Sequence, residues 1–249
     1  MPPTASRPRG TAAPQVRDDD GERAPVTPTA TKVPEQVSAT TRATRAQRDI
    51  IEVATAEFAA HGYAGARVDE IAARTRTTKR MIYYYFGSKE NLYLAVLEKA
   101  YAGIRAIERD IRVDEVPPVV AVRLLAEATY DHHTTHEEFM QLVSIENIHR
   151  AEYVKRSEAI LTQNASAIDL LAEVLDRGVR EGTFRGDLDA VDVHMMISAF
   201  ACFHVANRHT FAAIFKRDML DPSLQDSHRR LIGDMIVETL TGSRPEAGR

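Results

Sequence analysis

The segment 67–92 constrains the fold of this chain more than any other part of it. Ile71 and Ala72 give one short helical piece an apolar side, and Ile82 and Phe86, four residues apart, do the same for a second piece. The Thr-Arg-Thr-Thr run between them continues neither apolar side, but its hydroxyls can cap the helix that follows. The pattern predicts a helix-turn-helix.

The second piece has an outward face rich in hydrogen-bond donors, as expected of a helix that enters the major groove of DNA. Two further sets of cations flank it. Arginines near the start of the preceding helix are either a solvated face or phosphate contacts, and a lysine lies near the N-terminus of the helix that follows. The residues predicted to contact DNA are Arg42, Arg45, Arg67, Thr77, Thr78, Lys79, Arg80, Tyr83, Tyr84 and Lys89.

From about residue 41 to 92 the chain resembles the DNA-binding domain of TetR-type repressors. The resemblance is carried by Ala54, Phe58, Gly62-Tyr63, Val68-Asp69-Glu70-Ile71-Ala72, Lys79, Tyr83, Phe86, Lys89 and Leu92. It implies an all-helical fold, a dimer, and a small-molecule pocket in the C-terminal domain.

Two positions depart from the family's pattern. The family usually has a hydroxyl residue at position 67 to cap the second helix, where this chain has Arg67. It usually has glycine, which tolerates positive φ, at position 76, where this chain has Arg76. We therefore expect an altered cap and an altered turn.

The charge distribution agrees with one DNA-binding end. The net charge is −4, yet residues 41–92 hold nine Lys/Arg against six Asp/Glu, and residues 93–249 hold eighteen against twenty-five. A basic end on an acidic body presents one face to DNA and repels DNA elsewhere.

Composition also predicts the limits of the domains. Residues 1–40 hold seven of the eleven prolines and nothing that can bury a core, so we expect a disordered tail, with Arg7 and Arg9 along DNA as the alternative. The predicted domains are a three-helix DNA-binding domain (41–92) and a helical ligand-binding and dimerisation domain (93–242), followed by a flexible tail (243–249).

Helical periodicity without any strand pattern makes the predicted fold all-α. The segment 67–92 is expected to hold two short helices and the start of a third, which continues over 88–112. The other expected helices cover 41–61, 119–133, 137–149, 162–182, 190–215 and 222–241, with a shorter polar piece at 151–160. The helix that begins at Ser88 carries Lys89 on the DNA side and Tyr101, Ile104 and Arg105 on the ligand side. Helices 162–182 and 190–215 are expected to form the dimer interface, with Leu175 in it.

Polar residues on otherwise apolar helices are candidates for the ligand site, or else pair with one another or lie at the dimer contact. Aromatic residues nearby line a pocket or belong to the core. The predicted ligand-binding residues are Tyr101, Phe139, Glu146, Asn147, Tyr153, Phe200, Phe203, Asn207 and Arg208. Residues 139–153 and the later Asn207-Arg208-His209-Thr210-Phe211 also resemble RutR-like regulators, a subgroup associated with nucleobase catabolism.

The histidines and the single cysteine of the C-terminal domain allow alternatives to this interpretation. His132, His133 and His136 place imidazoles one turn apart, so a metal-binding protein or a helical enzyme is the alternative, but no carboxylate or cysteine accompanies them at established spacing. The single cysteine, Cys202, is either a small buried residue or a redox sensor.

The sequence thus predicts a non-enzymatic, cytoplasmic homodimer without a cofactor. It is expected to bind double-stranded palindromic operator DNA, to repress catabolic or transport genes, and to release the DNA when a small-molecule effector binds. No apolar run reaches the roughly 18–20 residues of a membrane span, and the N-terminus has no apolar signal-peptide core.

Overall fold

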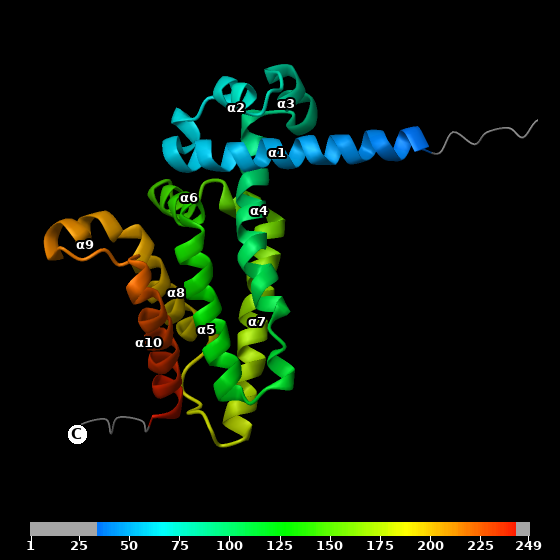
Figure 1. Ribbon diagram of the computed structural model, residues 1–249. Coiled ribbons are helices and arrows are strands. Elements are labelled where there is room, and N and C mark those ends of the chain that lie inside the picture. The colour runs from blue at the N-terminus through cyan, green and yellow to red at the C-terminus, as the bar shows by residue number, and fades with distance from the viewer. Residues whose placement is uncertain (1–33, 243–249) are drawn as a thin grey trace, which may run out of the picture. The chain divides into compact units, whose positions relative to one another are not determined.

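A computed structural model describes residues 34–242, with their side chains from residue 43 onward. The predicted tails, apart from residues 34–40, lie outside the described residues, as do Arg7, Arg9 and the side chain of Arg42. Over the described range the chain is helical, with no strand (Figure 1). The elements are α1 (Pro34–Gly65), α2 (Val68–Arg74), α3 (Lys79–Phe86), α4 (Lys89–Asp110), α5 (Pro118–Thr135), α6 (Glu137–Ile148), α7 (Glu158–Arg180), α8 (Ala190–Ala206), α9 (Arg208–Phe215) and α10 (Pro222–Thr241), with 3-10 turns η1 (Val113–Glu115) and η2 (Val154–Arg156).

Most helix ends follow the local signals in the sequence. The Ser88 hydroxyl accepts a hydrogen bond from the backbone N–H of Asn91, and so caps α4. Gly62 ends the regular part of α1 with φ 66° and ψ 175°, a conformation that favours glycine. The helix α1 begins at Pro34, seven residues before the expected start, and α10 has the predicted bounds.

The expectation of one helix over 190–215 was wrong. The chain breaks at Asn207, whose φ of −104° and ψ of 5° are not helical, and α8 and α9 meet at 68°. The residue after the break is fixed by two ion pairs: the Arg208 guanidinium bonds to Asp218 at 3.0 Å and to Glu137 at 2.8 Å. Within 34–242 no single helix is long and apolar enough to span a membrane; only the bent pair α8–α9, taken together, meets that length and composition.

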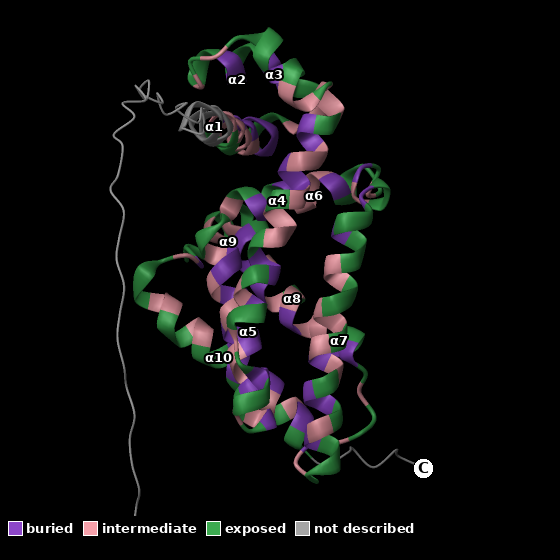
Figure 2. Ribbon diagram, turned by 90° about the vertical axis from the view of Figure 1, so that its right-hand side faces the viewer, coloured by how far each residue is buried: buried purple, intermediate pink, exposed green. Residues whose placement is uncertain are grey.

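The core of the C-terminal domain is built around α5. This helix packs against α7, α8 and α10 along its apolar sides, and Figure 2 shows the buried residues on the surfaces that these helices turn toward one another. Ala121, Val122 and Ala126 on α5 are fully buried there. Close packing at one end depends on Gly178, because a Cβ at that position would lie 2.0 Å from the Phe184 ring.

A second core joins the DNA-binding helices to the rest of the chain. Ile50, Phe58, Ile71 and Ile82 belong to the same cluster of buried side chains as Leu142 on α6. The two predicted domains therefore meet across a continuous apolar core.

Candidate nucleic-acid interface and ligand cavity

The region α2–turn–α3 has the predicted helix-turn-helix form. Ile71 and Ile82 are fully buried and hold the two short helices against α1 and α4. The Thr78 hydroxyl accepts a hydrogen bond from the backbone N–H of Met81 at 3.2 Å, so it caps α3 as the sequence indicated. Gly87, with φ 77°, ends the helix.

A buried carboxylate replaces the missing cap of α2. Arg67 at the N-cap makes no side-chain cap hydrogen bond. Instead, Glu57 on α1 accepts a hydrogen bond from the backbone N–H of Arg67 at 3.0 Å, and it also lies 3.8 Å from Arg74. A negative charge near the first turn suits the positive end of the helix dipole. The N-terminus of α2 is therefore stabilised by Glu57 on α1 as well as by Asp69 and Glu70 in its own first turn.

The turn between α2 and α3 keeps the left-handed backbone conformation for which the family usually has glycine. Arg76 has φ 53°, in the left-handed region where a side chain is disfavoured. The side chain is exposed beside the recognition helix. The substitution thus keeps the turn while adding a positive charge to this face.

The outward face of α3 presents the predicted donors to solvent. Tyr84 is 76% exposed and Tyr83 37%, and Lys79 and Arg80 are exposed as well, while Thr77 is half-buried. The Lys79 ammonium lies 3.1 Å from an Asp69 carboxylate oxygen.

The flanking cations lie on other elements. Lys89, in the first turn of α4, has its ammonium 4.9 Å from the centroid of the Tyr63 ring, and partial burial lowers its pKa. Arg67 is exposed 4.0 Å from Glu70, and Arg45 is exposed on α1.

Two of the predicted ligand residues instead contact the junction beneath the DNA-binding helices. Glu146 is 3% exposed, and its carboxylate accepts hydrogen bonds from the Tyr93 hydroxyl at 3.0 Å and from the backbone N–H groups of Tyr153 and Val154 at 3.0 and 3.1 Å. Both oxygens of Glu146 thus have partners inside the protein. The Tyr153 ring contacts those of Tyr63 and Tyr93.

The other predicted ligand residues are spread over several places. Asn147 is exposed and donates to the Val143 carbonyl at the end of α6, Asn207 ends α8, and Arg208 is held by its two ion pairs. Tyr101 and Phe139 contact edge to face at 5.4 Å. Phe200 and Phe203 line a cavity of about 400 Å³ beside α9 and α10.

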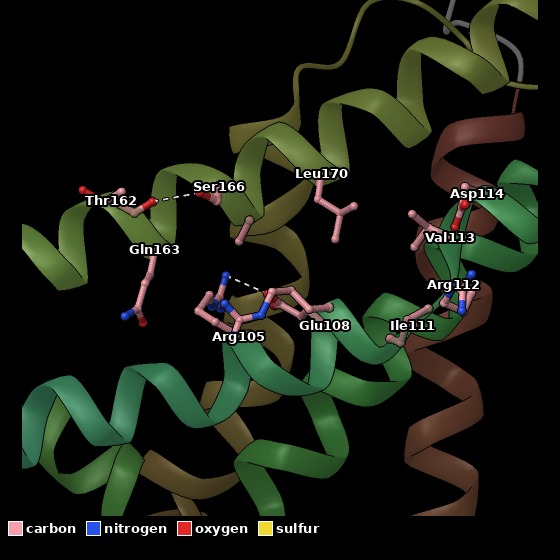
Figure 3. Close-up of a pocket in the computed structure, with 12 residues that line it drawn as sticks. Arg105, Glu108, Ile111, Arg112, Val113, Asp114, Thr162, Gln163, Ser166 and Leu170 are labelled. Atoms are coloured by element: carbon pink, nitrogen blue, oxygen red, sulfur yellow. Dashed lines mark hydrogen bonds and ion pairs between the residues drawn. The ribbon is translucent and has the colours of Figure 1, made fainter. Parts of the chain in front are cut away.

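A cavity of about 340 Å³ lies between α4 and α7, closed at one end by η1. Figure 3 shows Arg105 and Glu108 extending into it from α4, and Gln163 and Leu170 pointing back from α7. Of these four, only Arg105 was placed on the ligand side by the sequence. The signal for Glu108 was its position one turn after Arg105 on an apolar helix face.

The Arg105–Glu108 pair is buried and incompletely bonded. Arg105 Nη1 lies 2.9 Å from Glu108 Oε2, and the two side chains are each 8% exposed. Burial lowers the pKa of Arg105 and raises that of Glu108, and each partner's charge acts in the opposite direction.

The histidines of α5 lie in the interior. His132 and His133 are buried, and His132 stacks on His136 at 4.4 Å. Burial is the main cause that lowers the pKa of His132 to about 3 and that of His133 to about 4. Among residues 34–242, no group of three His, Cys, Asp or Glu side chains is arranged to hold a metal ion. Burial also raises the pKa of the Cys202 thiol to about 11, which does not suit a reactive thiolate.

Comparison with known proteins gives a consistent family. Residues 50–96 match the family described as "Bacterial regulatory proteins, tetR family", and residues 118–236 match "Tetracyclin repressor-like, C-terminal domain". The chain is 30% identical over 199 residues to the HTH-type transcriptional repressor NicS of Pseudomonas putida, covering 80% of this chain and 94% of that protein.

Solved structures share the fold. The putative transcriptional regulator SCO4942 from Streptomyces coelicolor has a TM-score of 0.60 and 27% identity, covering 80% of this chain and 98% of that one. FadR from Bacillus subtilis, solved in complex with stearoyl-CoA, has a TM-score of 0.56 at 20% identity, covering 74% and 96%. The helix-turn-helix, the helical second domain and these likenesses together show that the chain belongs to the TetR family of DNA-binding transcriptional repressors, non-enzymatic proteins that bind operator DNA and an effector ligand.

Proposed function

We propose that this chain is a ligand-responsive repressor that binds a palindromic operator as a homodimer and leaves it when a small molecule occupies the α4–α7 cavity. Its targets are catabolic or transport genes, a role supported by the resemblance to RutR-like regulators. The DNA contacts are those predicted above. Lys79 and Lys89 contact phosphates, and the residues near base edges are Thr78, Arg80, Tyr83 and Tyr84.

The observation that carries the proposal is that one helix reaches both sites. Lys89 stands in the first turn of α4, and Arg105 and Glu108 stand in its last two turns, on the cavity. Its 22 residues span about 33 Å at a rise of 1.5 Å each. A ligand that prefers one position of α4 therefore changes the spacing of the recognition helices.

The dimer interface is proposed on α8 and α10. Leu175 on α7, expected at the interface, is 6% exposed and belongs to the core of its own subunit. By contrast, Val191, Met195 and Phe203 on α8, at helical spacing, are 59%, 59% and 46% exposed. Leu231 on α10 lines the same cavity as Phe203 and widens the apolar strip. A second copy covers such a surface.

The test begins with the operator. Purified protein is used to select binding sites from random duplex DNA, and the sites are expected to be inverted repeats with half-site centres about 34–36 Å apart or a multiple of that. Selected sites without two-fold symmetry would contradict the dimeric mode of binding.

The effector is then sought by thermal shift, because a compound that binds the folded protein raises its melting temperature. A compound found in this way should weaken operator binding about 5–150-fold, and operator DNA should weaken its binding by the same factor. Equal affinities with and without DNA would rule out release by coupling.

A further inference from the structure

The α4–α7 cavity holds a buried ion pair whose hydrogen bonding is unfinished. Arg105 Nε and Nη1, Glu108 Oε2 and Gln163 Oε1 are buried and make no hydrogen bond to any residue of the described part of the chain. The 2.9 Å approach of Arg105 Nη1 to Glu108 Oε2 is an ion pair without hydrogen-bond geometry. Buried polar groups normally have partners, and a fully buried pair without them is destabilising.

The surroundings supply no partner from the protein. The other titratable groups that interact electrostatically with Arg105 are Tyr101, whose pKa burial raises, and the histidines His132, His133 and His194, whose pKa values burial lowers. All four are therefore neutral near pH 7, and none supplies a negative charge to Arg105. Ile111, Val113 and Leu170 give the cavity an apolar wall, and the charged residues Arg109, Arg112 and Asp114 also line it. A partner for the pair therefore comes from the cavity itself.

The pair presents donors and acceptors side by side. Arg105 offers N–H groups, Glu108 offers carboxylate oxygen, and Gln163 faces them from α7 with an amide that offers both (Figure 3). A ligand carboxylate would bond to Arg105 but would lie against the Glu108 carboxylate, and like charges at short range repel. A neutral ligand with a carbonyl beside an N–H satisfies both members.

We propose that the effector of this repressor is a neutral one- or two-ring compound with a cyclic amide edge, whose carbonyl accepts from Arg105 and whose N–H donates to Glu108. This rests on the proposed function of the cavity and adds the class of ligand. The volume of about 340 Å³ falls at the small end of the usual range of roughly 300–1,000 Å³, which suits such a compound.

The test uses three bicyclic probes of similar size in calorimetric titrations of the full-length protein without DNA. 2-Quinolone has the carbonyl beside an N–H, coumarin has a ring oxygen in place of that N–H, and 2-naphthoate is an anion. 2-Quinolone should bind, and the other two should bind at least about 10-fold more weakly. Coumarin has no N–H to donate to the Glu108 carboxylate, and the negative charge of 2-naphthoate is repelled by it. No binding of 2-quinolone at millimolar concentration, or equal binding of coumarin, would overturn the proposal.

A double variant locates the binding. Arg105→Met/Glu108→Leu replaces the buried pair by apolar groups of similar size, a change that other proteins tolerate or even gain stability from. It should keep the melting temperature and lose 2-quinolone binding at least about 10-fold. The matched control is Arg123→Gln/Asp234→Asn, a partly exposed ion pair between α5 and α10 that does not line the cavity, which should leave binding within about 2-fold. Unchanged binding in the Arg105/Glu108 variant would place the ligand elsewhere and refute the assignment.

The same probes separate this inference from the proposed function. If 2-quinolone binds through Arg105 and Glu108 but does not release operator DNA, the ligand class holds and the coupling fails. If another compound releases DNA while the Arg105/Glu108 pair is dispensable, the coupling holds and the ligand class fails.

Discussion

Lys79 is neutralised in the free protein. Its ammonium lies 3.1 Å from Asp69, and the two side chains are 48% and 57% exposed. An exposed pair of this kind contributes about 0–1 kcal/mol to stability, so DNA phosphate can take the lysine from it at little cost. Lys79→Ala should weaken binding to all DNA sequences alike and lower the salt slope by about 1, measured by fluorescence anisotropy at several salt concentrations.

Asp69→Asn serves as the opposite control. Removing this carboxylate frees Lys79 and takes a negative charge from the DNA face, so affinity for every sequence should rise. A Lys79→Ala variant that kept the salt slope and changed base preference instead would assign Lys79 to a base edge.

Arg76 stores backbone strain in the turn. A non-glycine residue in the left-handed region costs about 1–2 kcal/mol, and glycine there would cost roughly 0.5–1 kcal/mol of unfolded-state entropy. Arg76→Gly should therefore stabilise the protein by about 0.5–1 kcal/mol, seen as a rise of about 1–3 °C in melting temperature. It should also weaken DNA binding, because a charge is lost from the binding face.

Arg76→Asn separates the two effects, because asparagine tolerates the left-handed region better than arginine but also lacks the charge. It should share the loss of DNA affinity and show part of the gain in stability. A fall in melting temperature on Arg76→Gly would show that the arginine side chain holds the turn.

At the scale of helices, ends marked by local signals were predictable. Ser88 caps α4 and Gly62 ends the regular part of α1, as predicted, because each residue affects only the backbone within one helical turn of it. The break at Asn207 was not predictable, because no proline or glycine marks it and the contact of the neighbouring Arg208 is with Glu137, 71 residues away. The cavity was missed for the same reason, since only the packing of α7 on α4 brings Gln163 opposite Arg105.

The α5 helix makes stability depend on pH. In the unfolded chain His132 and His133 bind protons near pH 6.5, whereas burial lowers their folded pKa values to about 3 and about 4. The unfolded state therefore binds more protons below pH 6.5, and stability falls as the pH drops from 6.5 toward 4. The slope is at most about 1.4 kcal/mol per pH unit for each histidine.

The variant His132→Phe removes one of these two titrating groups. In urea unfolding between pH 7 and pH 4.5, its free energy of unfolding should therefore fall less steeply with decreasing pH than that of the wild type. Gln141→Ala, at an exposed position of α6 that does not titrate, should leave the slope unchanged. Equal slopes for His132→Phe and the wild type would mean that His132 has the same pKa in the folded and the unfolded protein, which would contradict the prediction.

At the scale of the whole molecule, the prediction concerns assembly. Phe203→Glu adds a charge to the exposed apolar strip of α8, and a charge left unpaired in an interface is costly. The variant should remain folded, because Phe203 is 46% exposed within the subunit, but should sediment as a monomer and lose most operator affinity.

Ile148→Glu is the matched control, since Ile148 at the end of α6 is 76% exposed and does not belong to the apolar strip of α8 and α10. It should sediment like the wild type. A dimer that persists in Phe203→Glu would move the interface off this strip.

The junction built on Glu146 limits how regulators of this kind can be recombined. Its carboxylate bonds to Tyr93, 53 residues earlier in the chain, and the Tyr93 ring contacts Phe58 at 4.8 Å and Tyr153 at 5.0 Å. A chimaera that joins a foreign helix-turn-helix after Leu92 keeps Tyr93, Glu146 and Tyr153 but replaces Phe58, and it also replaces Tyr63, whose ring contacts both tyrosines. The foreign helices must therefore present rings that fit Tyr93 and Tyr153 at positions 58 and 63, or be transferred together with Tyr93, α6 and the turn at Tyr153. Exchange of operator specificity between such proteins is thus limited by aromatic packing at residues that do not face DNA.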